Sequence, residues 1–200
     1  MSTNSDDRSR PQLRKELIDA AGNRLKTKGL EGFTLKQVAE DAGVSKQMIY
    51  TLFGVKADLV KAVYDRAVEQ MVEQLKAVTA SGPIDRLHQY AVAYREFVRE
   101  HEALFDMLYS LDLAKSFKER DKEIVKRNEI FDYYDEAIRA AIEEGYIDAE
   151  VDVESLTDSL WAAANGCIRL EIVGYYEDEN EAEQHYLETL SGLLEGYEPG

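Results

Sequence analysis

Five side chains between residues 46 and 51 can each form a specific contact with a nucleic acid base or phosphate: Lys46, Gln47, Met48, Tyr50 and Thr51. Lysine can donate to O6 and N7 of guanine, glutamine can pair with adenine through two hydrogen bonds, and methionine can contact a thymine methyl group. Tyrosine and threonine hydroxyls are suited to donate to phosphates. This chemistry requires a rigid element that presents the five side chains on one surface.

Residues 34–53 predict such an element, because they read as two short helices joined by a tight turn. Thr34 is a good N-cap, and Gln37 three residues later completes a capping box. Gly43 can adopt the left-handed conformation that ends a helix, and Ser45 is a second N-cap. The order of these signals is typical of a helix-turn-helix. An ordinary αα-corner uses the same turn chemistry, but the polar outward face of the second helix favours DNA binding.

The composition predicts an all-α protein with a sizeable core. The chain has 200 residues, of which 44% are hydrophobic and only three are proline, whereas good helix formers are abundant. No run of about twenty apolar residues could span a membrane, and the polar N-terminus lacks the apolar segment of a secretory signal. The single Cys167 excludes an internal disulfide and suits a reducing cytoplasm.

The charge is distributed unevenly along the chain, although the net charge of −16 first argues against a DNA-binding protein. Residues 1–66 contain 12 Lys and Arg against 9 Asp and Glu, a balance of +3. Residues 67–200 contain 12 Lys and Arg against 31 Asp and Glu, a balance of −19. Only the N-terminal segment can therefore approach phosphates without strong repulsion.

Hydrophobic periodicity predicts nine or ten helices and no strands. A first helix should run from Pro11 to Gly29. The later ones are expected at about 56–78, 84–109 with a break near His101, 114–144 with a possible interruption near Arg120, 153–175 and 179–196. The predicted organisation is a disordered tail (1–10), a DNA-binding domain (11–57) and a helical effector-binding and dimerisation domain (58–200).

The N-terminal segment from about Leu13 to Val63 resembles the TetR family of bacterial transcriptional regulators. The family pattern T-x-x-x-V-A-x-x-A-G-V-S-x-x-x-I-Y-x-x-F is matched at Thr34, Val38, Ala39, Ala42, Gly43, Val44, Ser45, Ile49, Tyr50 and Phe53. Lys56 and Leu59 follow as in the family.

The C-terminal part is similar to a subgroup of this family named for a W-x-x-x-H-G motif. Trp161, Gly166 and the following Leu170-Glu171 carry this similarity. Asn165 stands where the motif has histidine, so a role that needs a titrating imidazole is in doubt. Val55 stands where relatives often place a capping serine, at a cost of about 1 kcal/mol.

The resemblance implies that the helix beginning at Ser45 enters the major groove, with its first turn meeting base edges. The DNA-binding residues it implies are Thr34, Lys36, Ser45, Lys46, Gln47, Met48, Tyr50, Thr51 and Lys56. It further implies a homodimeric repressor on a palindromic operator, with half-sites roughly 34–36 Å apart. A small-molecule effector in the C-terminal domain would release the DNA by tilting the long helix that starts at Lys56. No catalytic residue, metal or cofactor is expected.

The ring-rich middle helices contain the candidate effector pocket. The candidate residues are Tyr64, Tyr90, Tyr94, Phe97, Phe105, Tyr109, Phe131, Tyr134, Trp161 and Asn165. Any one of these aromatic residues is more often an ordinary core residue than a ligand-binding residue. Their density favours an aromatic or amphipathic effector, and the surrounding acidity favours a neutral or cationic one.

The last two helices are expected to form the dimer interface. Ala162, Ala163 and Gly166 provide a small-residue surface, and Leu187, Leu190 and Leu194 give the final helix an apolar stripe. A two-fold four-helix contact would bury both surfaces.

The alternative functions are an enzyme, a protein-binding adaptor and an activator. An enzyme is disfavoured because His88, His101 and His185 lie far apart and no phosphate-binding loop, nucleophile elbow or zinc spacing is present. A helical adaptor that binds only protein is distinguishable by salt-dependent DNA binding. An activator in place of a repressor remains open.

Overall fold

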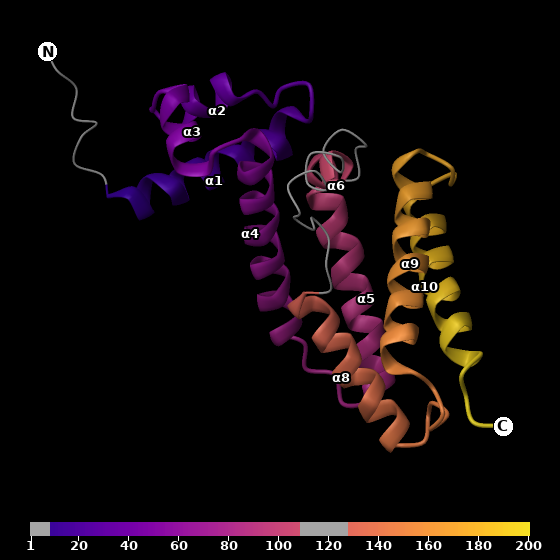
Figure 1. The fold of residues 1–200 in the computed structure, drawn as a ribbon. Coiled ribbons are helices and arrows are strands. Elements are labelled where there is room, and N and C mark those ends of the chain that lie inside the picture. The colour runs from indigo at the N-terminus through magenta and orange to yellow at the C-terminus, as the bar shows by residue number, and fades with distance from the viewer. Residues whose placement is uncertain (1–8, 109–127) are drawn as a thin grey trace, which may run out of the picture. The chain divides into compact units, whose positions relative to one another are not determined.

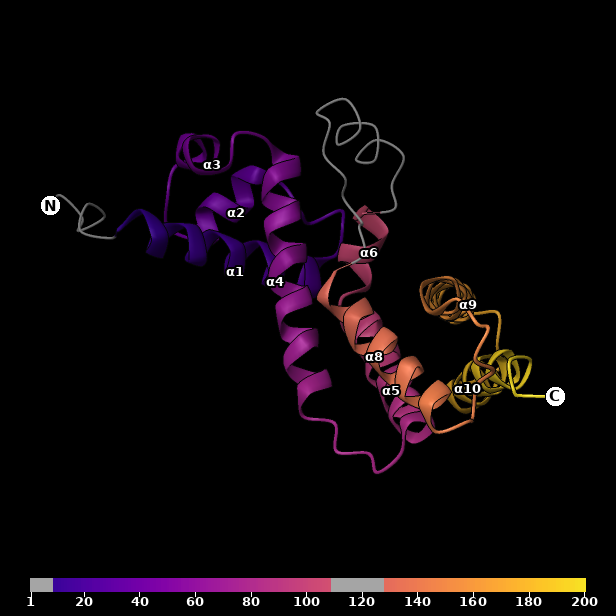
Figure 2. The same ribbon diagram turned by 60° about the horizontal axis from the view of Figure 1, so that its bottom comes forward.

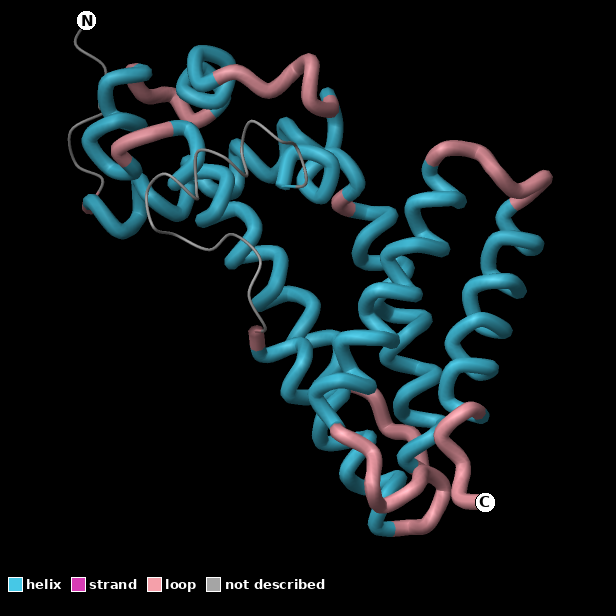
Figure 3. Tube along the Cα trace, turned by 45° about the vertical axis from the view of Figure 1, so that its right-hand side comes forward, coloured by secondary structure: helices cyan, strands magenta, loops and turns pink. Residues whose placement is uncertain are grey.

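The structure of the protein is a computed structural model, which describes residues 9–108 and 128–200. Within these ranges the chain forms only helices and loops (Figure 3), which confirms the predicted all-α class. The helices are α1 (Arg10–Lys28), α2 (Leu35–Asp41), α3 (Lys46–Phe53), α4 (Lys56–Lys76), α5 (Pro83–Glu100), α6 (Glu102–Leu108), α8 (Glu129–Glu143), α9 (Val153–Ile172) and α10 (Glu179–Glu195) (Figure 1).

Most helix ends lie within a few residues of their predicted positions. The predicted break near His101 is present, because α5 ends at Glu100 and α6 begins at Glu102. The helix predicted over 114–144 is described only from Glu129, and the earlier residues lie outside the described part. Arg10 was placed in a disordered tail, but it is the first residue of α1, whose N-cap Ser9 accepts from the backbone N–H of Gln12.

The chain divides into two compact units. The first contains the described residues up to Glu69 together with residues 100–108, and the second contains Gln70–Arg99 and residues 128–200. Helix α4 contributes its first part to one unit and its last part to the other. The domain boundary predicted at residue 57 remains a prediction.

In the first unit, α1 packs against α2, α3 and α6. Its buried stripe consists of Leu13, Leu17, Ala21 and Leu25, the one-face spacing of a helix that covers a core. Each fully buried leucine stabilises the fold by about 1.5–3 kcal/mol relative to an exposed one. The amphipathic pattern of the sequence therefore identifies the face of α1 that is buried, and the structure shows that α2 and α3 are among the helices it packs against.

A bidentate ion pair also links α1 to α2. Arg24 donates to both carboxylate oxygens of Asp41 at 2.6 and 2.9 Å, and its third nitrogen donates to the Gly32 carbonyl at 3.2 Å. The Arg24 hydrogen bond lowers the pKa of Asp41. Because Asp41 is the last residue of α2, this pair fixes the end of that helix.

In the second unit, α9 packs against both α8 and α10, and Figures 1 and 2 show α9 and α10 side by side. Phe97 of α5, Ile138 of α8 and Tyr186 of α10 are among the most deeply buried large side chains. The Tyr186 hydroxyl donates to the Ala91 carbonyl at 2.8 Å. A hydrogen bond thus connects α10 to the backbone of α5 inside the core.

A buried arginine joins α5 to α9 and α10. Arg95 is 3% exposed and donates to both carboxylate oxygens of Glu171 at 2.9 and 2.8 Å. It also donates to Glu183 at 2.9 Å, and Arg99 adds a second ion pair to Glu171 at 3.1 Å. A buried guanidinium is tolerated only when its donors are paired in this way.

Candidate nucleic-acid interface and ligand cavity

Both helices of the helix-turn-helix begin at capped residues. The Thr34 hydroxyl oxygen accepts from the backbone N–H of Gln37 at 3.3 Å, and Ser45 accepts from that of Met48 at 3.2 Å. The capping box differs from the expected form, since the Gln37 side chain accepts the Thr34 hydroxyl proton at 2.7 Å. In the standard form it would accept from the cap's backbone N–H.

The turn between the helices depends on a glycine. Gly43 has φ 63°, a conformation that costs other residues roughly 1 kcal/mol or more. Its N–H donates to the Glu40 carbonyl at 3.2 Å, and the next N–H, of Val44, donates to Ala39 at 2.9 Å. These bonds close the end of α2 and direct the chain into α3.

Helix α3 separates its buried face from its polar face, as predicted. Ile49 and Phe53 are buried, whereas the side chains of Lys46, Gln47, Tyr50 and Thr51 are exposed and Met48 is half-buried. The Lys46 ammonium lies 5.7 Å from the centre of the Tyr50 ring, so the two side chains share one surface. Four of the five candidate side chains are thus available to a partner.

Two threonine hydroxyls are already engaged within their helices. The Thr51 hydroxyl donates to the Gln47 carbonyl at 3.0 Å, and that of Thr34 donates to Gln37. A phosphate contact by either hydroxyl must replace this bond, because phosphate oxygens only accept. Tyr50 has no such commitment among the described residues.

The two remaining lysines of the candidate interface are exposed. Lys36 lies 3.8 Å from Glu40 on the same helix, a weak surface pair. Lys56, the first residue of α4, has its ammonium 5.1 Å from the centre of the Phe33 ring. Ser45 serves as the N-cap of α3, which leaves its backbone and hydroxyl at the start of that helix.

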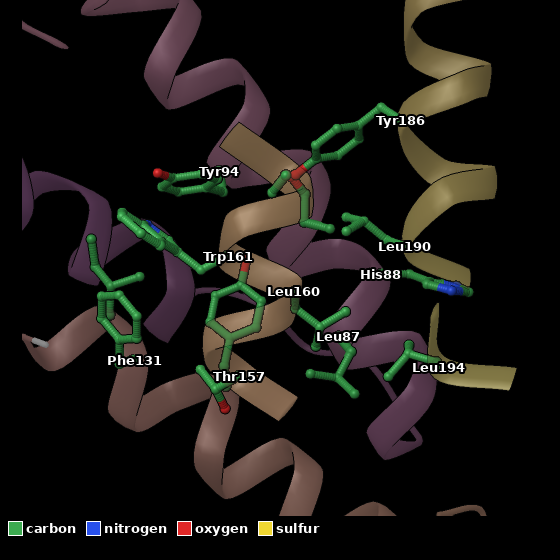
Figure 4. Close-up of a pocket in the computed structure, with 14 residues that line it drawn as sticks. Leu87, His88, Tyr94, Phe131, Thr157, Leu160, Trp161, Tyr186, Leu190 and Leu194 are labelled. Carbon is green, nitrogen blue, oxygen red and sulfur yellow. The ribbon is translucent and has the colours of Figure 1, made fainter. Parts of the chain in front are cut away.

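The second unit contains a partly open, largely apolar cavity of about 30 Å³, room for one or two water molecules. Figure 4 shows its lining from four helices: Leu87, His88 and Tyr94 of α5, Phe131 of α8, Thr157, Leu160 and Trp161 of α9, and Tyr186, Leu190 and Leu194 of α10. Ala91, Ile130, Tyr134 and Ala164 complete it. The lining contains no Lys, Arg, Asp or Glu.

Four of the ten predicted pocket residues line this cavity: Tyr94, Phe131, Tyr134 and Trp161. Tyr64 and Phe105 do not, because they are buried in the first compact unit. Tyr90 and Phe97 are buried core residues that do not reach it, and Tyr109 lies outside the described residues. The sequence prediction named aromatic residues and missed the aliphatic half of the lining, which includes Leu87, Leu160, Leu190 and Leu194.

The polar groups at the cavity are mostly paired with protein. The Tyr94 hydroxyl donates to the side-chain oxygen of Asn165 at 3.2 Å, and the Asn165 amide donates to the Trp161 carbonyl at 2.8 Å. Asn165 therefore holds the Tyr94 hydroxyl through a hydrogen bond, but it does not itself line the cavity. Trp161 lies between the rings of Tyr94 and Phe131 in Figure 4, with its ring 5.8 Å from that of Phe131.

Buried tyrosines predict a steep loss of stability at high pH. Burial raises the pKa of Tyr134 and Tyr186 well above its ordinary value of about 10. A raised folded-state pKa contributes stability that is complete below the unfolded pKa and is lost as pH rises. Above about pH 10, each such tyrosine should cost about 1.4 kcal/mol of unfolding free energy per pH unit. Urea unfolding at several values between pH 8 and 11 measures this slope.

Two phenylalanine variants test this alkaline slope. Tyr186→Phe should lose less stability per pH unit than the unchanged protein, because it removes one buried phenol. Tyr175→Phe is the matched control, since Tyr175 is 71% exposed and its hydroxyl meets water in both states. An unchanged slope in Tyr186→Phe would contradict the prediction.

The predicted dimer residues fall into two groups. Ala162 and Gly166 are exposed on α9, and Ala163 and Leu187 are half-buried. Leu190 and Leu194 are 4% and 7% exposed and line the cavity of their own protomer. Their role in a dimer interface stays a prediction, and the structure shows only that both leucines pack against the core of their own unit.

Comparison with known proteins gives a consistent assignment. Residues 17–63 match the model of bacterial regulatory proteins of the tetR family. Residues 87–193, more than half of the chain, match the model of the tetracyclin repressor-like C-terminal domain. No helix in the described part of the chain is long and apolar enough to cross a membrane.

Individual relatives agree with these models. The regulator AlkX of Mycobacterium tuberculosis is 30% identical over 95 residues, 48% of this chain and 45% of AlkX, so the match spans less than half of that relative. The transcriptional repressor KstR2 of Rhodococcus jostii is 24% identical over 170 residues, 75% of this chain and 77% of KstR2.

A solved structure of a Rhodococcus sp. protein assigned to the TetR family has the same fold. It superposes with a TM-score of 0.71 at 19% identity, over 91% of this chain and 98% of that chain. Similarity to the W-x-x-x-H-G subgroup stays a prediction. The matches at both ends of the chain, together with the capped helix-turn-helix and its exposed polar face, show that the chain belongs to the TetR family of bacterial helix-turn-helix transcriptional regulators.

Proposed function

We propose that this protein is a homodimeric repressor that binds a palindromic operator through α3 and is released by a small apolar molecule. The observation that carries the proposal is the exposed polar face of α3, presented by a capped helix whose opposite face is buried. This face lies in residues 1–66, whose charge balance is +3, whereas that of residues 67–200 is −19. A DNA-reading surface needs both properties.

The roles of the individual residues follow from their position and chemistry. Lys46 and Gln47 are proposed to contact base edges because they lie in the first turn of α3. Met48 would contact a thymine methyl group. Tyr50 and Lys56 are proposed as the main phosphate contacts, because neither spends its polar group on an internal hydrogen bond among the described residues. Further backbone contacts are assigned to Thr34, Lys36, Ser45 and Thr51.

The exposed side of α9 is the proposed centre of the dimer interface. Ala162, Gly166, Leu170 and Val173 are all exposed and recur at the spacing of one helix face. A side chain added at Gly166 would meet nothing within 4 Å in its own protomer. Its own fold therefore does not require a glycine there, whereas close approach of a second helix would. Ala163 and Leu187 are placed at the edge of this contact.

The effector is proposed to be neutral and largely apolar, with a ring system or an amphipathic character. The cavity lining carries no charged side chain, so an ionic ligand would lose its hydration without compensation. The acidity of the second unit as a whole is compatible with either a neutral or a cationic effector. The uncharged lining of the cavity favours the neutral one. Typical ligand sites enclose about 300–1,000 Å³, so a ligand must open the cavity of about 30 Å³.

Opening the cavity is proposed to act on DNA binding through α4. This helix is continuous from Lys56 to Lys76 and contributes to both compact units. A change in the second unit that moves the last turns of α4 should also move the end of α4 that begins at Lys56. The ligand shifts the equilibrium only by its preference for the state that does not bind DNA.

Selection of DNA from a random pool with the purified protein tests the proposed function. A palindromic sequence should emerge, with half-sites about one helical turn apart. Affinity for it should fall steeply between about 50 and 200 mM salt, because bound phosphates release counterions. Neutral hydrophobic compounds should then release the protein from this DNA, whereas permanently charged analogues of the same size should not.

Each part of the experiment can contradict one part of the proposal. A protein that enriches no sequence and shows no salt-dependent binding would be an adaptor and not a DNA-reading regulator. Enrichment of a site without two-fold symmetry would contradict binding as a homodimer. Release of the protein from this DNA by charged compounds alone would contradict the assignment of the apolar cavity as the effector site.

A further inference from the structure

Two arginines of α1 reach the C-terminal end of α3. Arg14 donates to the Leu52 carbonyl at 3.2 Å, and its guanidinium carbon lies 4.3 Å from the centre of the Phe53 ring. Arg10, one turn earlier, donates to the Thr51 carbonyl at 3.5 Å. Figure 2 shows α1 and α3 together in the first unit, where the two helices are in contact.

These contacts supply what the end of α3 lacks. The last four carbonyls of a helix have no partner within it. In α3 the Tyr50 carbonyl accepts from the Gly54 N–H at 2.9 Å, and the next two carbonyls, of Thr51 and Leu52, accept from Arg10 and Arg14. Positive charge at this end also complements the helix dipole.

Helix α3 has particular need of such anchoring because it is only eight residues long. Isolated helices of this length are marginal in water, so their orientation depends on tertiary contacts. Ile49 and Phe53 anchor the buried face, but apolar contacts alone are not directional. The arginine hydrogen bonds restrain rotation and sliding of α3, and both motions would displace Lys46 and Gln47.

We propose that Arg14, assisted by Arg10, is a positioning residue that orients α3 for base recognition without itself contacting DNA. The inference rests on the proposed function, since it requires α3 to be the helix that reads bases. Base-edge hydrogen bonds depend on placement within a few tenths of an ångström, whereas phosphate attraction does not. Loss of Arg14 should therefore reduce discrimination between DNA sequences more than it reduces binding to DNA in general.

Arg24 offers a matched control on the same helix. Its guanidinium donates to Asp41 of α2 and to the Gly32 carbonyl, so the hydrogen bonds it forms among the described residues stabilise the same unit without involving α3. Lysine at either position keeps the positive charge but lacks the planar guanidinium group and its several donors. Comparing Arg14→Lys with Arg24→Lys therefore separates positioning of α3 from general stability.

The experiment measures affinity for the selected operator and for a scrambled duplex of the same length, over a range of salt concentrations. Arg14→Lys should lower the ratio of the two affinities about fivefold to tenfold, because ring stacking and a charge-assisted hydrogen bond at an exposed site are weak individually. Its affinity for the scrambled duplex should stay unchanged. Arg24→Lys should lower the melting temperature and leave the ratio unchanged.

Three outcomes would overturn the inference. If Arg14→Lys and Arg14→Ala both keep the affinity ratio of the unchanged protein, α3 is oriented without Arg14. If Arg14→Ala weakens binding to both duplexes equally and reduces the salt slope by about one per lost phosphate contact, Arg14 is a phosphate ligand. If the unchanged protein prefers no sequence at all, the proposed function fails first, and no reading surface exists for Arg14 to position.

Discussion

Replacing Lys46 and Gln47 together by alanine is expected to lower affinity for the selected operator about a hundredfold. Each good base contact is worth about 1–3 kcal/mol of discrimination, and about 1.4 kcal/mol corresponds to a factor of ten. Both side chains are exposed in the first turn of α3, and alanine is a better helix former than either residue. Fluorescence anisotropy with the operator and with a scrambled duplex measures the loss.

One single variant and one control make this result specific. Gln47→Ala should cost about tenfold on the operator without changing the salt slope, because glutamine carries no charge. Gln89→Ala on α5 is the matched control, since Gln89 is also exposed and lies outside the proposed interface. Full operator affinity in the double variant would show that another surface reads the DNA.

Replacing Arg95 by alanine is expected to destabilise the protein by about 3 kcal/mol. Removing one partner of a buried ion pair typically costs about 3–5 kcal/mol, because the other charge stays buried. The lower end applies here because Glu171, which is 13% exposed, keeps its ion pair with Arg99 at 3.1 Å. For a chain of this length, a melting temperature lower by roughly 10 °C should result.

A double variant separates the charge effect from lost packing. Glu171→Gln combined with Arg95→Met removes the buried charge and retains an apolar side chain, so it should recover part of the stability lost in Arg95→Ala. Lys61→Ala, which breaks the exposed pair with Asp65 at 2.7 Å, serves as the control and should change stability by less than about 1 kcal/mol. Equal effects of Lys61→Ala and Arg95→Ala would contradict the prediction.

The helix-turn-helix could be predicted almost completely from sequence because its signals are local. The caps Thr34 and Ser45, the turn glycine Gly43 and the buried Ile49 each act within four residues along the chain. Local hydrogen bonds and a required backbone conformation leave few alternatives for such a stretch. The same locality explains why the break at His101 and most helix ends were predictable.

The arginine contacts could not be predicted, because they join residues far apart in the chain. Arg95 looks like an ordinary polar residue between apolar ones, and its partner Glu171 lies 76 residues away. Arg14 contacts Leu52 across 38 residues. A helix pattern identifies which side is apolar, but it does not identify which distant charge a long side chain meets.

The cavity shows a second limit of sequence patterns. The leucines of α10 form one apolar stripe, and a stripe does not reveal whether it faces its own core or a partner chain. Leu190 and Leu194 line the cavity of their own protomer, which left the small residues of α9 as the exposed surface. Rings were sought as pocket residues, although apolar cavities are lined equally well by aliphatic side chains.

The small volume of the cavity also bears on how sensitive a switch of this kind can be. If only a minor, opened form accepts the effector, the apparent dissociation constant is the intrinsic one divided by the fraction that is open. If the proposed effector binds in this cavity of about 30 Å³, a higher effector concentration would be needed for a given response than with a preformed site. The same tight packing that stabilises the resting fold would thus reduce the response to weakly binding compounds. It would also reduce the response to low concentrations of the effector itself.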